Sequence, residues 1–155
     1  MKYLVVYYSR SGNNKTLANA IAKSLSADLD EIVDKKKRSG KLGWLRAGRD
    51  AQAENLTDIS IEKNPQDYDI IIIGSPIWAS KLTPAVRTYL AQQDLKNKQV
   101  AFFICSGGDG YAQVFPLLKQ LTPDSVHLST LGINEKQFKE GSYEPELNAF
   151  IESLK

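Results

Sequence analysis

The sequence LVVYYSRSGNN at residues 4–14 decides the fold, because it joins a short apolar run to a polar turn. The run Leu4–Tyr8 consists of leucine, valine and tyrosine, a composition typical of a strand that is buried on both faces. Beyond the turn, Leu17, Ile21 and Leu25 recur at helical spacing. The stretch therefore predicts a buried strand, a tight polar loop and an amphipathic helix.

The same alternation continues along the chain. Apolar runs at Ile70–Ile73 and Val100–Ile104 predict two more buried strands, and weaker runs at Leu29–Val33 and Val126–Leu131 predict two others. Apolar residues at helical spacing lie after these runs, at Val86, Tyr89, Leu90, Val114, Leu117, Leu118, Leu121, Leu147, Phe150, Ile151 and Leu154. This order predicts an open, doubly wound α/β sheet with helices on both faces, whose ligand site lies at the carboxyl ends of the strands.

Length and composition exclude several other classes of protein. The chain has 155 residues, of which 42% are hydrophobic and 25% charged, so it is expected to form a single globular domain over residues 1–155. One cysteine cannot form an internal disulfide, and no run approaches the roughly 20 apolar residues of a membrane span. A reducing cytoplasm is therefore the expected location. The net charge of +2 does not indicate nucleic acid as a partner.

The turn after the first strand offers an anion-binding site. Hydroxyls, amides and one glycine precede a helix, so backbone N–H groups and the positive end of the helix dipole face the turn. The spacing is neither the GxxxxGK[ST] of a P-loop nor the GxGxxG of dinucleotide binding, which favours a phosphate monoester. The alternative is a well-capped turn in which Ser11 or Asn13 is the N-cap.

Two further loops follow strands at the same expected edge. The loop GSPIWASKLTP at residues 74–84 places Trp78 where it would cover a flat aromatic ligand, although it would also fit packing beneath its own loop. The loop CSGGDGY at residues 105–111 has three glycines, which allow close backbone approach to a ligand. Tyr111 would supply a second aromatic face, or would simply begin the next helix.

Together these motifs, SRSGNN at 9–14, GSPIW at 74–78 and SGGDGY at 106–111, resemble those of a short-chain flavodoxin over essentially the whole chain. The resemblance implies a flavodoxin-like three-layer sandwich, with a five-stranded parallel sheet in the order 2-1-3-4-5. It also implies FMN as the cofactor. Independently of the resemblance, no cluster of His, Cys, Asp and Glu has the spacing of metal ligands, and no serine or cysteine has a convincing base, so neither a metal site nor a catalytic residue is predicted. In the family, a glycine in the second loop usually permits a peptide flip toward the reduced flavin, but Trp78–Ser80 contains no glycine.

Each part of FMN is assigned by this resemblance to one loop. The phosphate is expected at Ser9, Arg10, Ser11, Gly12, Asn13 and Asn14, the ring at Ser75, Pro76, Ile77, Trp78 and Ala79, and the pyrimidine edge at Ser106, Gly107, Gly108, Asp109 and Tyr111. Trp78 is the leading candidate for stacking on the ring. Outside these loops, Cys105 is expected to be a small buried side chain and His127 to satisfy a local hydrogen bond.

The charges are distributed unevenly. Seven of the 20 basic residues lie between Lys35 and Arg49 with no acidic residue among them, which leaves 13 basic against 18 acidic residues, a balance of −5, elsewhere. The stretch 35–49 would attract a phosphorylated pyridine nucleotide, another anionic partner or a membrane surface. The alternative interpretation is a solvated loop that binds nothing. Within the wider region, residues 44–53 are expected to add a short helix.

Three functions are compatible with these residues. The first is a low-potential electron carrier that docks transiently with a reductase and with acceptor proteins. The second is an FMN-dependent NAD(P)H or quinone reductase, and the third is a non-redox module for a phosphorylated ligand. The short chain and the lack of an added nicotinamide-binding segment favour the carrier, and the acidic balance outside 35–49 indicates docking to basic partners.

Overall fold

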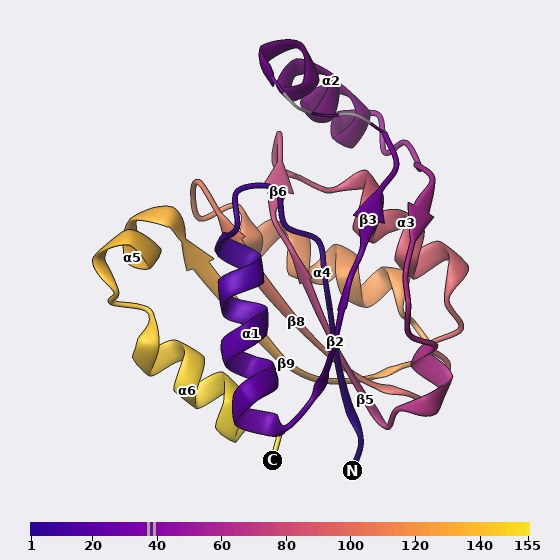
Figure 1. The fold of residues 1–155 in the computed structure, drawn as a ribbon, viewed down its shortest axis with the longest axis vertical. Coiled ribbons are helices and arrows are strands. Elements are labelled where there is room, and N and C mark those ends of the chain that lie inside the picture. The colour runs from indigo at the N-terminus through magenta and orange to yellow at the C-terminus, as the bar shows by residue number, and fades with distance from the viewer. Residues whose placement is uncertain (37, 39) are drawn as a thin grey trace.

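The computed structural model describes residues 1–36, 38 and 40–155, and its centre is a five-stranded parallel sheet (Figure 1). The strand order is β2-β1-β5-β8-β9, which confirms the predicted order 2-1-3-4-5. The strands are β1 (Tyr3–Tyr7), β2 (Asp28–Glu31), β5 (Ile70–Ser75), β8 (Gln99–Ser106) and β9 (Val126–Asn134). All five agree with the apolar runs in the sequence to within a few residues.

Helices and two short strand pairs complete the fold. The helices are α1 (Asn13–Leu25), α2 (Gly40–Gln52), α3 (Pro84–Gln92), α4 (Tyr111–Leu121), α5 (Glu135–Glu140) and α6 (Glu144–Glu152), with a 3-10 turn η1 (Pro65–Asp67). Antiparallel pairs form between β3 (Val33–Asp34) and β4 (Ile59–Ser60), and between β6 (Ile77–Trp78) and β7 (Lys81–Leu82). These two-residue strands were not predicted, because a period of two cannot be recognised over two residues.

Side chains from the two faces of the sheet form two cores. In β1, Leu4 and Val6 pack on the side of α3 and α4, whereas Val5 packs on the side of α1 and α6. This alternation follows from the pleat of the strand. Leu17 and Ile21, from the predicted helical stripe, are fully buried in the second core. The arrangement confirms three layers, with helices on both faces (Figure 1).

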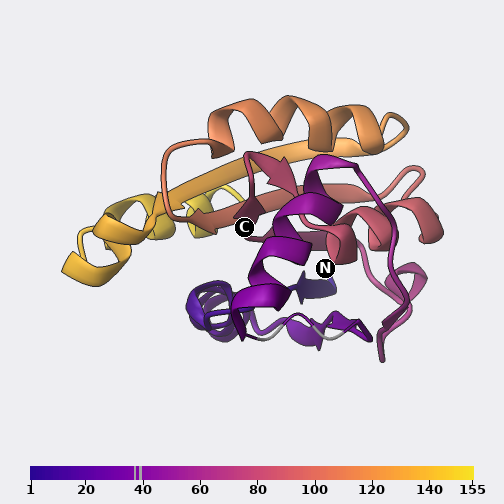
Figure 2. The ribbon, with the colours of Figure 1, turned by 90° about the horizontal axis from the view of Figure 1, so that it is seen from above.

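The strand register brings the loops after β1, β5 and β8 to one edge of the sheet. Tyr7 lies opposite Gly74, and Ser75 lies opposite Ile104. Helix α2 lies across this carboxyl edge, as the views from the side and from above both show (Figures 1 and 2). The predicted helix at 44–53 is therefore present, but it begins four residues earlier, at Gly40.

Among the described residues, no helix combines the length and the apolar composition needed to cross a membrane.

Candidate functional site

The loop after β1 leaves the N-terminus of α1 open. The backbone of Gly12 is left-handed, with φ of 96°, and its N–H donates to Ser9 Oγ at 3.1 Å. Gly12 is itself the N-cap residue, and no side chain caps the helix, so the alternative of a turn capped by Ser11 or Asn13 is wrong. The first N–H groups of a helix have no partner within the helix, and the first turn of α1 contains no acidic residue. These donors are therefore available to an anion.

Asn14 joins this loop to the end of β8. Its side-chain amide donates to the carbonyl oxygen of Cys105 at 3.1 Å and accepts from the Cys105 N–H at 3.0 Å. Asn14 is buried, so this pair of hydrogen bonds fixes the distance between the loop after β1 and the loop after β8. The Asn14 side chain is thus used structurally, and only its backbone N–H faces the open helix end.

The second loop is a tight hairpin between β6 and β7. Its two central residues, Ala79 and Ser80, have φ of 49° and 60°, the left-handed pair of a type I′ turn. Such a turn normally contains glycine or asparagine, which explains why the sequence did not indicate it. The carbonyl oxygen of Ala79 accepts from Gln52 Nε2 at 3.0 Å, so α2 is fastened to the tip of the hairpin.

Trp78 is held from several sides. The Tyr8 ring meets it edge-on with centroids 5.5 Å apart, and the guanidinium carbons of Arg10 and Arg38 each lie 5.6 Å from its centroid. Arg10 Nη2 also donates to the carbonyl oxygen of Arg38 at 3.0 Å. Cation–π contacts of this kind are worth about 0.5–2 kcal/mol each. They fix the orientation of the indole at the edge of the sheet.

A cavity of about 600 Å³ lies between the three loops and α2. Eight of the predicted site residues line it: Arg10, Ser11, Pro76, Ile77, Trp78, Ala79, Ser106 and Gly107. The remaining predicted residues lie outside this lining: Ser9, Gly12, Asn13, Asn14, Ser75, Gly108, Asp109 and Tyr111. Ligand cavities usually measure about 300–1,000 Å³, so this volume is sufficient for a small organic molecule.

Tyr111 packs away from the cavity. Its ring lies so close to Gly132 of β9 that a Cβ there would come within 2.2 Å of it. The ring is also 6.1 Å from that of Phe115, and burial is the main cause of its raised pKa. The structure therefore gives Tyr111 a packing contact on α4 and β9.

Five lining residues were not predicted as site residues: Trp44, Ala47, Gly48, Cys105 and Glu135. Trp44, Ala47 and Gly48 come from α2, which crosses the open edge. The sequence offered one signal for these residues, since Trp44 is an aromatic residue within a basic stretch. In the structure its side chain is 64% exposed. The Cys105 thiol is buried, and burial, partly offset by a hydrogen bond with Asn13, raises its pKa to about 11.

A buried ion-pair network anchors α2. Arg38 Nε lies 2.6 Å from Asp34 Oδ2, Arg38 Nη1 lies 2.7 Å from Asp50 Oδ2, and Lys36 Nζ lies 2.5 Å from the same oxygen. Burial disfavours the Asp50 carboxylate, but the hydrogen bonds from Lys36, Arg38 and Asn55 outweigh it and lower the pKa of Asp50 to about 2. Part of the predicted basic stretch is thus neutralised internally; Lys37 lies outside the described residues.

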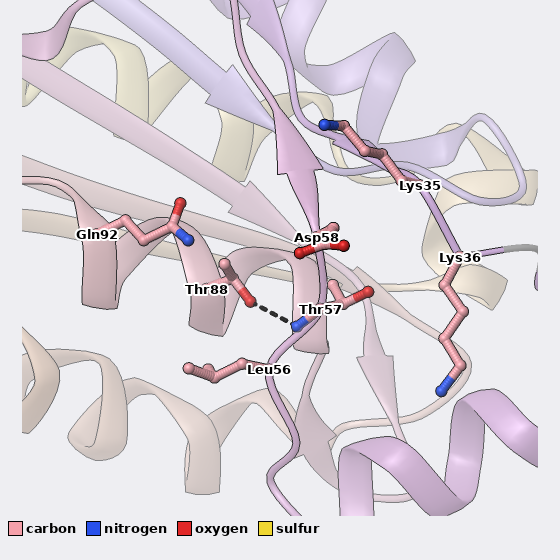
Figure 3. Close-up of a pocket in the computed structure, with 7 residues that line it drawn as sticks. All are labelled: Lys35, Lys36, Leu56, Thr57, Asp58, Thr88 and Gln92. Carbon is pink, nitrogen blue, oxygen red and sulfur yellow. Dashed lines mark hydrogen bonds between the residues drawn. The ribbon is translucent and has the colours of Figure 1, made fainter.

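A second cavity, of about 510 Å³, lies away from these loops, between the β3–β4 pair and α3 (Figure 3). Thr88 Oγ1 accepts from the Thr57 N–H at 2.9 Å, Thr57 Oγ1 donates to Asp34, and Lys36 pairs with Asp50. In Figure 3 the two lysines, Lys35 and Lys36, point in different directions. The polar groups here bind one another or diverge, so they do not converge on a ligand.

The remaining candidates have local roles. His127 Nε2 lies 2.8 Å from Thr122 Oγ1 and 3.0 Å from the Thr122 carbonyl oxygen, so the predicted local hydrogen bond of His127 is confirmed. Among the described residues, no three His, Cys, Asp or Glu side chains are grouped closely enough to hold a metal ion.

These features define a class of protein. It is a doubly wound α/β protein whose first helix presents an open N-terminus beside an aromatic cavity at the carboxyl edge of the sheet, where the strand order reverses. The family model described as flavodoxin matches residues 2–153, and the chain belongs to the flavodoxin family.

Individual relatives agree with this assignment. The chain is 27% identical over 114 residues to a flavodoxin of Maridesulfovibrio salexigens, a match covering 70% of this chain and 65% of that relative. The chain therefore spans about 65% of the length of that relative. The fold is similar to that of a flavoprotein from Lactobacillus acidophilus in complex with FMN, with a TM-score of 0.74, 22% identity and coverage of 91% and 98% of the two chains. It is also similar to an NADPH-quinone reductase from P. pentosaceus, with a TM-score of 0.61, 12% identity and coverage of 97% and 96%.

Proposed function

We propose that the protein binds FMN and carries electrons between a reductase and acceptor proteins as a low-potential flavodoxin. The observation that supports this best is the cavity of about 600 Å³ that opens beside the uncapped N-terminus of α1. FMN needs both features, because its phosphate would bind at the helix N-terminus and its flat ring would lie in the cavity. The donor set fits FMN, because it pairs backbone N–H groups and hydroxyls with an aromatic wall.

The phosphate would lie at Ser9–Asn14. Ser9 Oγ accepts the Gly12 N–H and so holds the turn in shape, while the N–H groups of Asn13 and Asn14 point outward from the first turn of α1. Ser11 lines the cavity. Lys15 is less available as a cation, because its Nζ pairs with Glu31 at 3.1 Å.

The ring would lie between Ser75–Ala79 and Ser106–Asp109, against Trp78. When bound there, FMN supplies one-electron and two-electron redox chemistry. The residues of the chain orient the ring and exclude water from one side of it, since Pro76, Ile77 and Trp78 form an apolar wall. Arg10 brings a positive charge to the rim, where its guanidinium is engaged by the Trp78 ring and by the carbonyl oxygen of Arg38.

The second candidate is an FMN-dependent NAD(P)H or quinone reductase. The observation that favours it is α2, which adds Trp44 and a basic surface to the rim of the cavity. A flat nicotinamide or quinone would stack on such a wall, and a phosphate would be attracted by the cations.

A visible spectrum of the purified protein after addition of FMN and gel filtration tests the proposal. We expect a stable yellow complex that oxidises NAD(P)H slowly in the presence of quinone, unless a separate reductase is added. Rapid NAD(P)H oxidation without a reductase would instead assign the protein to the second candidate. A colourless protein after gel filtration would contradict both.

A further inference from the structure

Helix α2 presents an outer surface that the fold itself does not use. Three large apolar side chains, Leu42, Trp44 and Leu45, are 80%, 64% and 61% exposed. Soluble proteins seldom gather such residues on one helix without an interaction to bury them. The buried side of the same helix consists of Gly43, Ala47, Asp50 and Ala51, so the small residues pack inward and the large ones face solvent.

Cations lie between these apolar residues. Lys41, Arg46 and Arg49 are exposed on the same face, and none has a carboxylate within 4.0 Å among the described residues. Two basic residues that precede the helix, Arg38 and Lys36, differ in this respect, because Asp34 and Asp50 neutralise them. The outer face is therefore apolar and positively charged at once.

We propose that this face, hereafter the α2 face (Lys41, Leu42, Trp44, Leu45, Arg46 and Arg49), is the docking surface for an acidic redox partner protein. The inference rests on the proposed electron-carrier function. It differs from the expectation from charge balance, which was that the acidic remainder of the chain would dock to basic partners. Outside residues 35–49 the chain has a balance of −5, which repels an acidic protein, so the α2 face is the region where such a partner is attracted.

The position of α2 suits electron transfer. Trp44, Ala47 and Gly48 line the cavity proposed for FMN, and α2 lies over the carboxyl edge of the sheet (Figures 1 and 2). A protein bound to the outer face would therefore come to rest beside the rim of that cavity. Two anchors keep the helix there, the Arg38–Asp50 ion pair and the hydrogen bond from Gln52 to Ala79.

The distribution of side chains favours a protein over a lipid surface. At 3.6 residues per turn, basic and apolar side chains alternate around the exposed arc of α2, with Arg49 between Leu42 and Leu45. Helices that lie in a membrane surface separate an apolar stripe from a polar one, so that the apolar stripe can insert. Mixed surfaces rich in Trp and Arg are typical of the energetic centres of protein interfaces.

The test uses NMR titration of the ¹⁵N-labelled apoprotein with a purified acidic c-type cytochrome and, separately, with a basic one. We expect the acidic cytochrome to shift the amide signals of residues 41–49 and to bind more weakly as salt is added. The triple variant K41E/R46E/R49E should weaken this binding at least about tenfold. The matched variant K23E/K96E/K119E makes the same change in charge at exposed lysines elsewhere and should leave binding within about twofold.

A second variant tests the apolar part of the surface. L42S/L45S should weaken binding about tenfold without changing its dependence on salt, because it removes buried apolar area and no charge. Thermal unfolding of each variant establishes that it is folded. Because these residues are exposed, we expect midpoints close to that of the unchanged protein.

Three outcomes would overturn the proposal: equal weakening by both charge variants, binding of the basic cytochrome alone, or shifts confined to residues outside 41–49. The last experiment measures sedimentation of the protein with vesicles of one part phosphatidylglycerol to three parts phosphatidylcholine. Sedimentation with these vesicles that is lost in K41E/R46E/R49E would assign the face to lipid instead. Failure of FMN to bind contradicts the proposed function and leaves the apoprotein titration interpretable, so the two ideas fail separately.

Discussion

Two residues at the rim of the cavity have backbone conformations that are unfavourable for any residue with a Cβ. Ala79 and Ser80 both occupy the left-handed region, where a Cβ is unfavourable by roughly 1 kcal/mol. The hydrogen bond from Gln52 to the Ala79 carbonyl helps to hold this conformation. The hairpin tip beside Trp78 is thus kept in one shape by its surroundings rather than by its own sequence.

Replacing Ala79 by glycine should therefore stabilise the protein. We expect the free energy of unfolding of A79G to rise by about 0.5–1 kcal/mol, because glycine adopts positive φ without strain. Urea denaturation followed by circular dichroism measures the change. The same replacement inside α1, A20G, should lower the free energy by about 1 kcal/mol. A loss of stability in A79G equal to that in A20G would contradict the turn geometry.

Cys105 lines the cavity at the end of β8, and its reactivity tests how far its thiol is shielded from solvent there. Its thiol is buried with a pKa of about 11 instead of 9.0, so at pH 8 the reactive thiolate is about 100-fold scarcer than for an unshifted thiol. We expect reaction with a chromogenic disulfide reagent to be at least about 100-fold slower in the native protein than in urea. Equal rates in the two conditions would show that the end of β8 is open to solvent.

At the scale of elements, α2 is attached mainly by polar contacts. A Cβ on Gly43 would lie 2.3 Å from the carbonyl carbon of Arg38, so the helix packs directly on that backbone. Around this contact lie the ion pairs of Arg38 with Asp34 and Asp50. Breaking a buried pair by removing one partner leaves an uncompensated charge, which destabilises by about 3–5 kcal/mol.

Acid should therefore loosen α2 through Asp50. The pKa of Asp50 is about 2 in the folded protein against 3.8 for an unperturbed carboxyl, so its contribution of roughly 2 kcal/mol is complete above about pH 4. This contribution is lost as the pH falls from about 4 toward 2. Urea unfolding at pH 7 and at pH 3 measures it.

Two variants separate Asp50 from the other carboxylates. D50N should be destabilised at pH 7 by about 3–5 kcal/mol and should lose less further stability at pH 3 than the unchanged protein. The exposed Asp58, which has no ion pair among the described residues, provides the control, and D58N should retain the normal loss. Identical pH dependence in D50N and D58N would refute the role of the network.

The regular elements of this fold could be predicted from the sequence, whereas its local turns and ion pairs could not. The strands at Ile70–Ile73 and Val100–Ile104 were recognisable because both of their faces are buried, so that every residue in them is apolar. The Ala79–Ser80 turn was not recognisable, since its residues lack the usual turn preference. The burial of Arg38 depends on Asp34 and Asp50, which lie on either side of the basic stretch and meet it only in the fold.

At the scale of the whole molecule, the sheet assembles a site from distant segments. The predicted order of strands brings Ser11, Trp78 and Ser106 to one cavity, although they are far apart in the sequence. Half of the predicted site residues line that cavity, because topology places loops but not individual side chains. Tyr111 illustrates the difference, since the absence of a side chain at Gly132 lets its ring pack against β9.

Isothermal titration calorimetry with FMN and with riboflavin tests most directly whether the protein is a flavodoxin that holds a flavin phosphate at α1. The two ligands share the ring and differ in the phosphate, which we place at the open N-terminus of α1. Charge-assisted hydrogen bonds to backbone N–H groups should make FMN bind at least about 100-fold more tightly, roughly 2.7 kcal/mol. Equal affinities for FMN and riboflavin would contradict the phosphate site at α1, and binding of neither would contradict the proposed flavin site as a whole.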